Sequence, residues 1–159
     1  RIREKDNAGK TALMHEQTQR GRIALTYTAA SWSCRSQIDL AVSSYLKRSS
    51  GYMLTETGTW SPAAWLSLTA TAGYFHTSDF ASRIYVYERG PLYAFSFPSF
   101  YGRGMRCGLF ARADLSCRLM FILRCSATRY FDRSTISSEL QQIHSSMMSD
   151  LDIQLRWKF

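Results

Sequence analysis

The sequence predicts an all-β fold, an antiparallel up-and-down transmembrane β-barrel to which this chain contributes about eight strands. Three observations predict it. Apolar and polar residues alternate along most of the chain, tight and longer connections follow each other, and the tryptophans gather near the tight connections. The composition agrees, because aromatic residues reach 14% of the 159 residues and only three residues are proline, a balance that favours strands.

Alternation with a period of two defines the expected strands. It is clearest at the end of the chain, where one face carries Leu151, Ile153, Leu155, Trp157 and Phe159 and the other carries Asp150, Asp152, Gln154, Arg156 and Lys158. The expected strands cover residues 1–6, 14–30, 35–47, 52–60, 65–76, 104–114, 118–131 and 149–159. The first is too short to span a bilayer, so we expect residues 1–159 to be the C-terminal part of a larger barrel with a truncated N-terminus.

A membrane helix is not expected. The longest aliphatic run, Leu119 to Leu123, is far shorter than the ~20 apolar residues of a helical span, whereas a spanning strand needs only about 9–11 residues.

The connections between these strands differ at the two ends of the expected barrel. Residues 31–34, 61–64 and 115–117 form tight turns, whereas residues 77–103 and 132–148 form long loops at the opposite end. Short periplasmic turns and long outer loops are typical of outer-membrane barrels. Within the first loop residues 82–88 predict an external hairpin. In the second, Ile136, Leu140, Ile143 and Met147 have the spacing of a short amphipathic helix.

Aromatic residues form two belts separated by the length of one strand. Bilayer interfaces select such belts, because amphipathic rings sit well at the level of the headgroups. The belt at the tight turns contains Trp32, Trp60, Trp65, Trp157 and Phe159, and the belt at the long loops contains Tyr45, Tyr52, Tyr74 and Tyr130.

The polar face of the strands predicts the lining of the lumen. Its charged residues are Arg22, Asp39, Arg106, Arg112, Asp114, Arg124, Asp152 and Arg156. One interpretation is a basic lumen that attracts anions, since rings of charge tune the selectivity of pores. The other is a network of Arg–Asp pairs that fills and braces a narrow barrel. We favour the second.

Other classes of protein fit the sequence less well. A soluble lipocalin-like barrel would also alternate, and Gly58 to Trp60 match its short G-x-W motif, but a soluble barrel would turn its charges outward. A lipid-modifying enzyme at the outer rim would need a nucleophile and a base. His76 and the adjacent pair His144 and Ser145, with Glu139 nearby, lack the surrounding motif. No catalytic residue, cofactor or metal site is therefore predicted.

The net charge of +8 and the four cysteines do not point to a particular function. The basic residues are spread over many strands without a nucleic-acid-binding module, so no nucleic acid is expected as a partner. The cysteines have no metal-ligand spacing and are expected to be free thiols.

Three stretches carry a resemblance to a known group of proteins: SRIYVYERGPLYAFSFPSFYGRGMR, TRYFDRSTISS and the closing DIQLRWKF. With them, the chain from about residue 20 onward resembles the C-terminal portion of outer-membrane β-barrel proteins of the Bacteroidota. The resemblance implies an outer-membrane location, contact with outer-membrane lipid and, through the terminal aromatic Phe159, recognition by the barrel assembly machinery. It transfers no catalytic or ligand-binding residue.

Two functions remain after these exclusions. The chain is expected to be a pore or transport component for polar solutes, anionic ones among them. The alternative is a structural or complex-forming barrel that binds another envelope protein through loops 77–103 and 132–148. The sequence favours the pore slightly and names neither a substrate nor a partner.

Overall fold

The computed structural model describes residues 2–7, 10–44, 47–94, 97–136 and 143–159, with side chains from residue 17 onward. Its main element is one antiparallel sheet of eight strands, which follow each other in space in chain order and so confirm the predicted all-β, up-and-down arrangement. The strands are β1 (Ile2–Asn7), β2 (Lys10–Thr28), β3 (Trp32–Ser44), β4 (Arg48–Ala63), β5 (Leu66–Thr77), β8 (Arg103–Asp114), β9 (Leu119–Tyr130) and β10 (Met147–Trp157). In the described part of the chain, no helix is long and apolar enough to cross a membrane.

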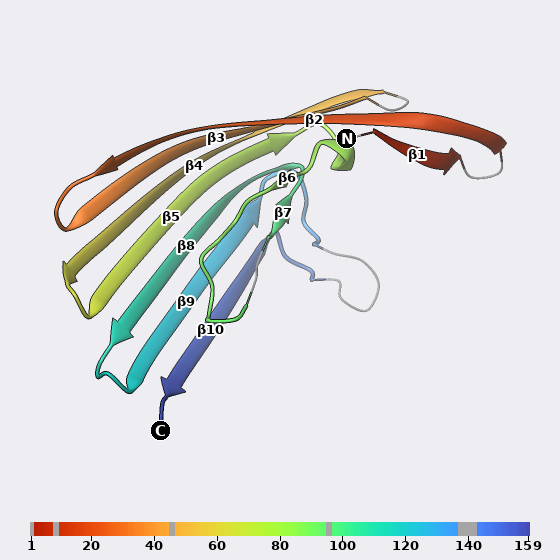
Figure 1. The fold of residues 1–159 in the computed structure, drawn as a ribbon. Helices are drawn as coiled ribbons and strands as arrows, with labels where there is room; N and C mark the ends of the chain where they lie inside the picture. Colours follow the sequence, from red (N-terminus) through yellow and green to blue (C-terminus); the bar gives the residue numbers. More distant parts are fainter. Residues whose placement is uncertain (1, 8–9, 45–46, 95–96, 137–142) are drawn as a thin grey trace.

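The sheet is curved but open (Figure 1). Its edge strands are β1 and β10, and β10 pairs only with β9. The sheet is therefore not closed into the predicted barrel. The strand ends lie within a few residues of those expected, and β4 runs on past Trp60 through an irregularity that contains Pro62. Proline is tolerated there because a bulge needs no ladder N–H from it.

The register of the sheet gathers apolar residues on its convex face, while its concave face carries most of the charged residues and one buried apolar cluster. On the convex face Ile38, Leu54 and Tyr74 lie side by side. One residue further along, Thr55, Gly73 and Arg106 share the concave face. Because successive side chains of a strand point to opposite faces, the same pairing of strands places both groups of residues.

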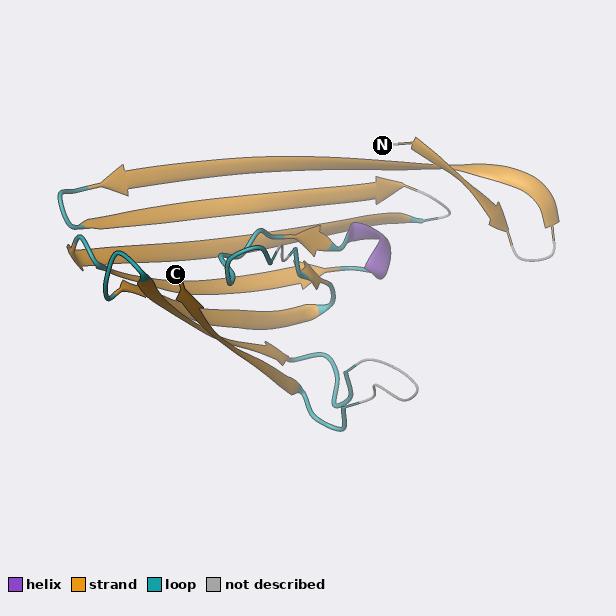
Figure 2. Cartoon of the chain, turned by 60° about the horizontal axis from the view of Figure 1, so that its bottom comes forward, coloured by secondary structure: helices purple, strands orange, loops and turns teal. Residues whose placement is uncertain are grey.

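Residues 78–94 and 97–102, between β5 and β8 and together named segment 78–102 below, fold back over the concave face (Figures 1 and 2). They contain the short helix η1 (Phe80–Ser82) and the strands β6 (Ile84–Tyr85) and β7 (Ser99–Phe100), which pair with each other. The expected external hairpin is thus wrong in both pairing and direction. The physical reason is burial: Ile84, Val86 and Phe100 have only 3%, 6% and 3% of their surface exposed, and a hairpin projecting into water would lose that burial.

The buried apolar cluster lies between the sheet and this inward-folded segment. Phe75 is at its centre, fully buried, with the rings of Phe100 and Tyr130 at 5.2 Å and 5.6 Å. A Cβ atom at Gly104 would lie 2.6 Å from Cζ of Phe75, so glycine makes room for this ring. The cluster contains Ala41, Met53, Phe75, Ile84, Val86, Phe100, Tyr130 and Ile136.

The second long loop does not form the expected helix where it is described. Ile136 and Ile143 pair through both backbone hydrogen bonds of an antiparallel bridge, and β10 begins at Met147. Leu140 lies outside the described residues. Burial of Ile136 in the apolar cluster outweighs the weak helical preference of so short a segment.

Candidate functional site

Segment 78–102 is fastened to the sheet at both of its ends. At its junctions with β5 and β8, the backbone N–H of Thr77 donates to the carbonyl of Gly102 (2.8 Å), and the N–H of Gly102 donates to Oγ1 of Thr77 (2.8 Å). Gly102 has φ of +83°, a conformation open to glycine at little cost. Further along, the buried Ser82 accepts a hydrogen bond from the hydroxyl of Ser49 on β4 (2.7 Å). These contacts turn the segment inward.

Glu88 joins the middle of this segment to two strands. Arg106 of β8 donates two hydrogen bonds to its carboxylate, at 2.8 Å and 2.9 Å, in a bidentate pair. Arg124 of β9 donates to the same carboxylate at 2.7 Å. Burial raises the pKa of Glu88, but the hydrogen bonds and charge of Arg106, followed by those of Arg124, outweigh it and hold the pKa below its usual value. Glu88 is therefore a carboxylate at neutral pH and latches the segment to the sheet.

Arg106 is the most deeply buried member of the predicted lumen charges. Its side chain is only 4% exposed, and it also donates to the hydroxyls of Ser126 and Thr128 at 2.8 Å each. Gly73 stands opposite it on β5, and a Cβ atom there would lie 2.8 Å from the methyl carbon of Met53. Such complete pairing is what a buried guanidinium requires.

The other predicted lumen charges form smaller pairs on the same face. Arg22 pairs with Asp39, Arg112 with Asp114 at 3.1 Å, and Arg124 with Asp152 at 3.1 Å. Arg156 has no ion pair among the residues that the structure describes. The predicted lumen set lacks Glu88, which completes the network, because the sequence predicts residues 77–103 to be an outer loop. The signal was present: Ile84, Val86 and Glu88 alternate as one face of a segment that lies on a surface.

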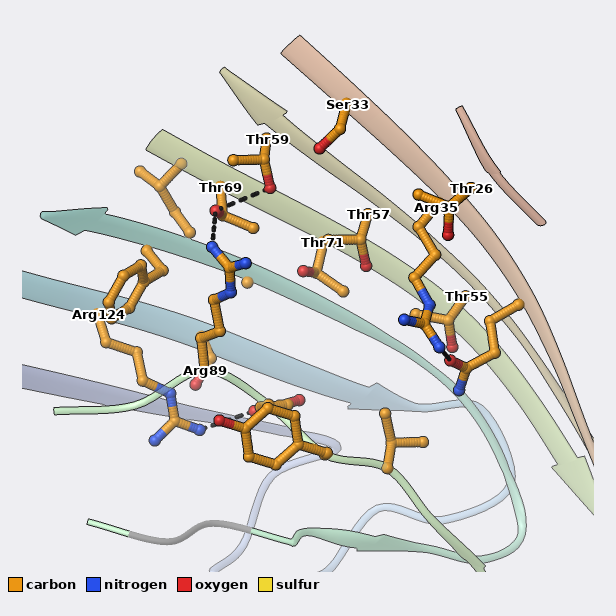
Figure 3. Close-up of a pocket in the computed structure, with 18 of the residues that line it drawn as sticks. Thr26, Ser33, Arg35, Thr55, Thr57, Thr59, Thr69, Thr71, Arg89 and Arg124 are labelled. Carbon is orange, nitrogen blue, oxygen red and sulfur yellow. Dashed lines mark hydrogen bonds and ion pairs between the residues drawn. The ribbon is translucent and has the colours of Figure 1, made fainter. Parts of the chain in front are cut away.

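Beside this latch lies a pocket of about 370 Å³, bounded by the sheet and by segment 78–102. Rows of hydroxyl groups form its floor, because Thr57 faces Thr71 and Thr59 faces Thr69 across β4 and β5, the second pair with oxygens 3.1 Å apart (Figure 3). Threonine suits this floor, since its branched side chain favours a strand while its hydroxyl faces the pocket. The serine and threonine residues of the lining are Thr26, Ser33, Thr55, Thr57, Thr59, Thr69, Thr71 and Ser126.

Two arginines of the pocket differ from the paired ones. Arg35 of β3 donates to Oε1 of Gln37 at 3.1 Å, and Arg89 of segment 78–102 donates to Oγ1 of Thr69 at 3.4 Å. Neither has a carboxylate within ion-pair distance among the described residues. Figure 3 shows them on opposite sides of Thr57 and Thr71. The pocket therefore has two cationic groups whose charge no described carboxylate neutralises.

The predicted interface aromatics differ in how far they are exposed. Trp32, Trp60, Trp65 and Trp157 are exposed beside the tight turns, as are Phe159 and, at the other end, Tyr52. Tyr74 is half-buried, and Tyr45 lies outside the described residues. Tyr130 differs from the expectation: it faces the concave side, packs on Phe75 and is only 7% exposed.

The residues considered for catalysis and the cysteines occupy unremarkable places. The ring centroids of His76 and Tyr52 lie 5.8 Å apart. The Ser145 hydroxyl accepts a hydrogen bond from the backbone N–H of Met147 at 3.0 Å. Glu139 lies outside the described residues. All four cysteines are free thiols. No protein-family model, curated protein or solved structure matches the chain.

Proposed function

We propose that this chain is part of an outer-membrane β-barrel that passes polar solutes, with a preference for anions, through a lumen narrowed by segment 78–102. The observation that carries the proposal is the polarity of the sheet. Its convex face exposes apolar side chains, while its concave face holds hydroxyl and charged side chains. Membrane barrels need this inverted polarity, since lipid lies outside them and water inside.

The convex face is far more apolar than a water-exposed surface tolerates. Leu25, Ile153 and Leu155 expose 75%, 64% and 63% of their surface. A continuous apolar face of this kind in water is a site of association or aggregation. In a bilayer each such side chain leaves water instead, which is worth about 1.5–3 kcal/mol. The exposed aliphatic residues of this face include Ile23, Leu25, Ile38, Leu40, Leu54, Leu109, Leu151, Ile153 and Leu155.

The soluble lipocalin-like alternative requires the opposite polarity. A soluble barrel fills its interior with apolar side chains and turns its charges to water. Here Arg106 and Glu88 are enclosed on the concave face, while Leu109 of the same strand β8 is 49% exposed on the convex face. The membrane interpretation accounts for both sets of residues.

A membrane location also requires the two edges of the sheet to be paired. Each unpaired N–H or C=O group along β1 and β10 would cost several kcal/mol in hydrocarbon, which is why membrane-spanning sheets are closed. The proposal therefore implies that strands beyond these eight, from the same protein or another copy, complete the barrel. Such a barrel is wide enough for a lumen that segment 78–102 narrows without filling.

The choice between a pore and a docking scaffold follows from the long loops. The scaffold alternative needs loops 77–103 and 132–148 as outer surfaces for a partner, but the first of them is held on the concave side of the sheet by the ion pairs of Glu88. An inward loop that carries charge narrows a passage and sets its selectivity. Arg35 and Arg89 give that passage a cationic character.

Reconstitution of the intact protein tests the proposal. We expect a detergent-dependent protein whose folded and heated forms migrate differently, and which conducts in planar bilayers with chloride passing more readily than potassium under a salt gradient. Solubility without detergent would contradict the membrane location. A membrane-bound protein without conductance, or one that selects potassium, would contradict the transport function.

A further inference from the structure

We propose that the threonine-floored pocket between Arg35 and Arg89 binds an acidic saccharide, a sugar that carries a carboxylate or similar anionic group. The inference rests on the proposed function, because the pocket belongs to the solute path, and it names the class of solute. Its starting point is the difference between these two arginines and Arg22, Arg106, Arg112 and Arg124, which all pair with carboxylates.

The anionic group of the ligand is selected by the two unneutralised guanidinium groups. Arg35 and Arg89 are both exposed to the pocket and hold only neutral hydrogen-bond partners, Gln37 and Thr69. A planar guanidinium binds a carboxylate or other oxyanion through two parallel hydrogen bonds, and such charge-assisted bonds are about twice as strong as neutral ones. An incoming anion can displace the amide of Gln37 from Arg35, or the hydroxyl of Thr69 from Arg89, because it replaces a neutral hydrogen bond with a stronger charge-assisted one.

The body of the ligand is selected by the floor. Thr57 and Thr71 face each other across paired strands, and each hydroxyl can both donate and accept a hydrogen bond. Facing pairs on neighbouring strands repeat at the strand spacing of about 4.8 Å, so the floor presents a two-dimensional array of donors and acceptors. Polyhydroxylated ligands match such an array, whereas a small inorganic anion would leave most of it unused.

Tyr87 adds an apolar surface to the same pocket. Its ring, 53% exposed, lines the pocket next to Glu88 and packs at 5.5 Å from the ring of Phe97. An aromatic ring with a polar tip offers a flat face for the C–H side of a sugar ring. The volume of about 370 Å³ lies at the lower end of the range of small-molecule sites, which fits a ligand of about one or two sugar rings.

Three probes separate the parts of this inference: glucuronate, its neutral counterpart glucose, and acetate. Saturation-transfer NMR titrations of the intact protein in detergent measure binding without any need for transport. We expect glucuronate to bind at least about ten-fold more tightly than glucose, because one charge-assisted contact is worth that much. We expect a similar advantage over acetate, which keeps the carboxylate but lacks the hydroxyl groups that meet the threonine floor. Equal affinities for glucuronate and acetate would remove the saccharide from the proposal, and equal affinities for glucuronate and glucose would remove the anionic group.

Substitutions then assign the binding to this pocket. Arg35→Gln and Arg89→Gln should each weaken glucuronate binding by at least about ten-fold, and Arg118→Gln, the same change at an exposed turn outside the pocket, should leave it unchanged. Thr57→Val keeps the shape and strand preference of the residue and should weaken binding of the sugar without disturbing the fold. Full affinity in all three pocket variants would overturn the proposal.

The proposal and the function that it rests on fail separately. Anion conductance without glucuronate binding would contradict the saccharide site and leave the pore. Glucuronate binding that depends on Arg35 and Arg89, without conductance, would support the site and contradict the pore.

Discussion

The two faces of the sheet place the same strands in opposite surroundings. On the concave face, Arg106 exposes 4% of its side chain and has a partner for each of its donor groups. On the convex face, Leu109 of the same strand is 49% exposed and lies beside other apolar residues, Ala70 and Cys125. The register of the strands thus encloses charged side chains on the concave face and leaves apolar side chains exposed on the convex face. A lipid environment reconciles the two faces, since it removes the convex side chains from water.

The largest effect is expected on the concave face, at Arg106. Arg106→Met would remove the main partner of Glu88 and leave a largely enclosed carboxylate held by Arg124 alone. Breaking a buried ion pair by removing one partner costs about 3–5 kcal/mol. We expect a loss of this size in the free energy of unfolding, measured by denaturant titration of the protein in lipid vesicles.

A double variant distinguishes the lost pair from lost packing. Glu88→Gln combined with Arg106→Met should destabilise by less than the sum of the two single variants, because they interact directly. Additive effects would show that the latch between segment 78–102 and the sheet contributes little.

A charge placed on either face compares the two surroundings directly. Leu109 and Thr71 lie near the middle of adjacent strands β8 and β5, the first on the convex face and the second in the pocket. Leu109→Arg should lower the free energy of unfolding in a bilayer by about 2–4 kcal/mol, as arginine does on the lipid face of a barrel. Thr71→Arg, its control, should cost clearly less because the pocket is polar. Equal losses would show that the convex face does not meet lipid.

The sequence predicted the strands and their two faces because both depend on a local signal. Alternation is a property of neighbouring residues, so the run from Leu151 to Trp157 could be assigned without any knowledge of its partners. It would also have placed Tyr130 correctly, since Tyr130 follows Ser126 and Thr128 on the concave face. Its position at the end of β9 favours the aromatic belt, but its place in the alternation puts it on the concave face.

The inward path of segment 78–102 could not be predicted in the same way. Glu88 meets arginines that lie 18 and 36 residues further along the chain, and the choice between an inward and an outward loop depends on that encounter. The pocket shares this difficulty, because Arg35 and Arg89 come together only when the segment covers the sheet. The bridge between Ile136 and Ile143 is difficult to predict for a related reason, since Ile136 packs into an apolar cluster whose other members are distant in sequence.

The smallest effect is expected at Glu56, a carboxylate that departs from the apolar pattern of the convex face. Glu56 lies on that face of β4 among Leu25, Ala72 and Leu54, and its Oε2 accepts a hydrogen bond from Ser36 at 2.8 Å. A carboxylate on a lipid face is unfavourable, though less so than the roughly 2–4 kcal/mol of arginine. Glu56→Leu should therefore raise the free energy of unfolding in vesicles by about 1 kcal/mol, and Glu56→Gln by less, since the amide keeps a polar group in the same place. If Glu56→Leu instead destabilises the protein, the hydrogen bonds of the carboxylate, that from Ser36 among them, outweigh its unfavourable surroundings, and the convex face does not meet hydrocarbon at that point.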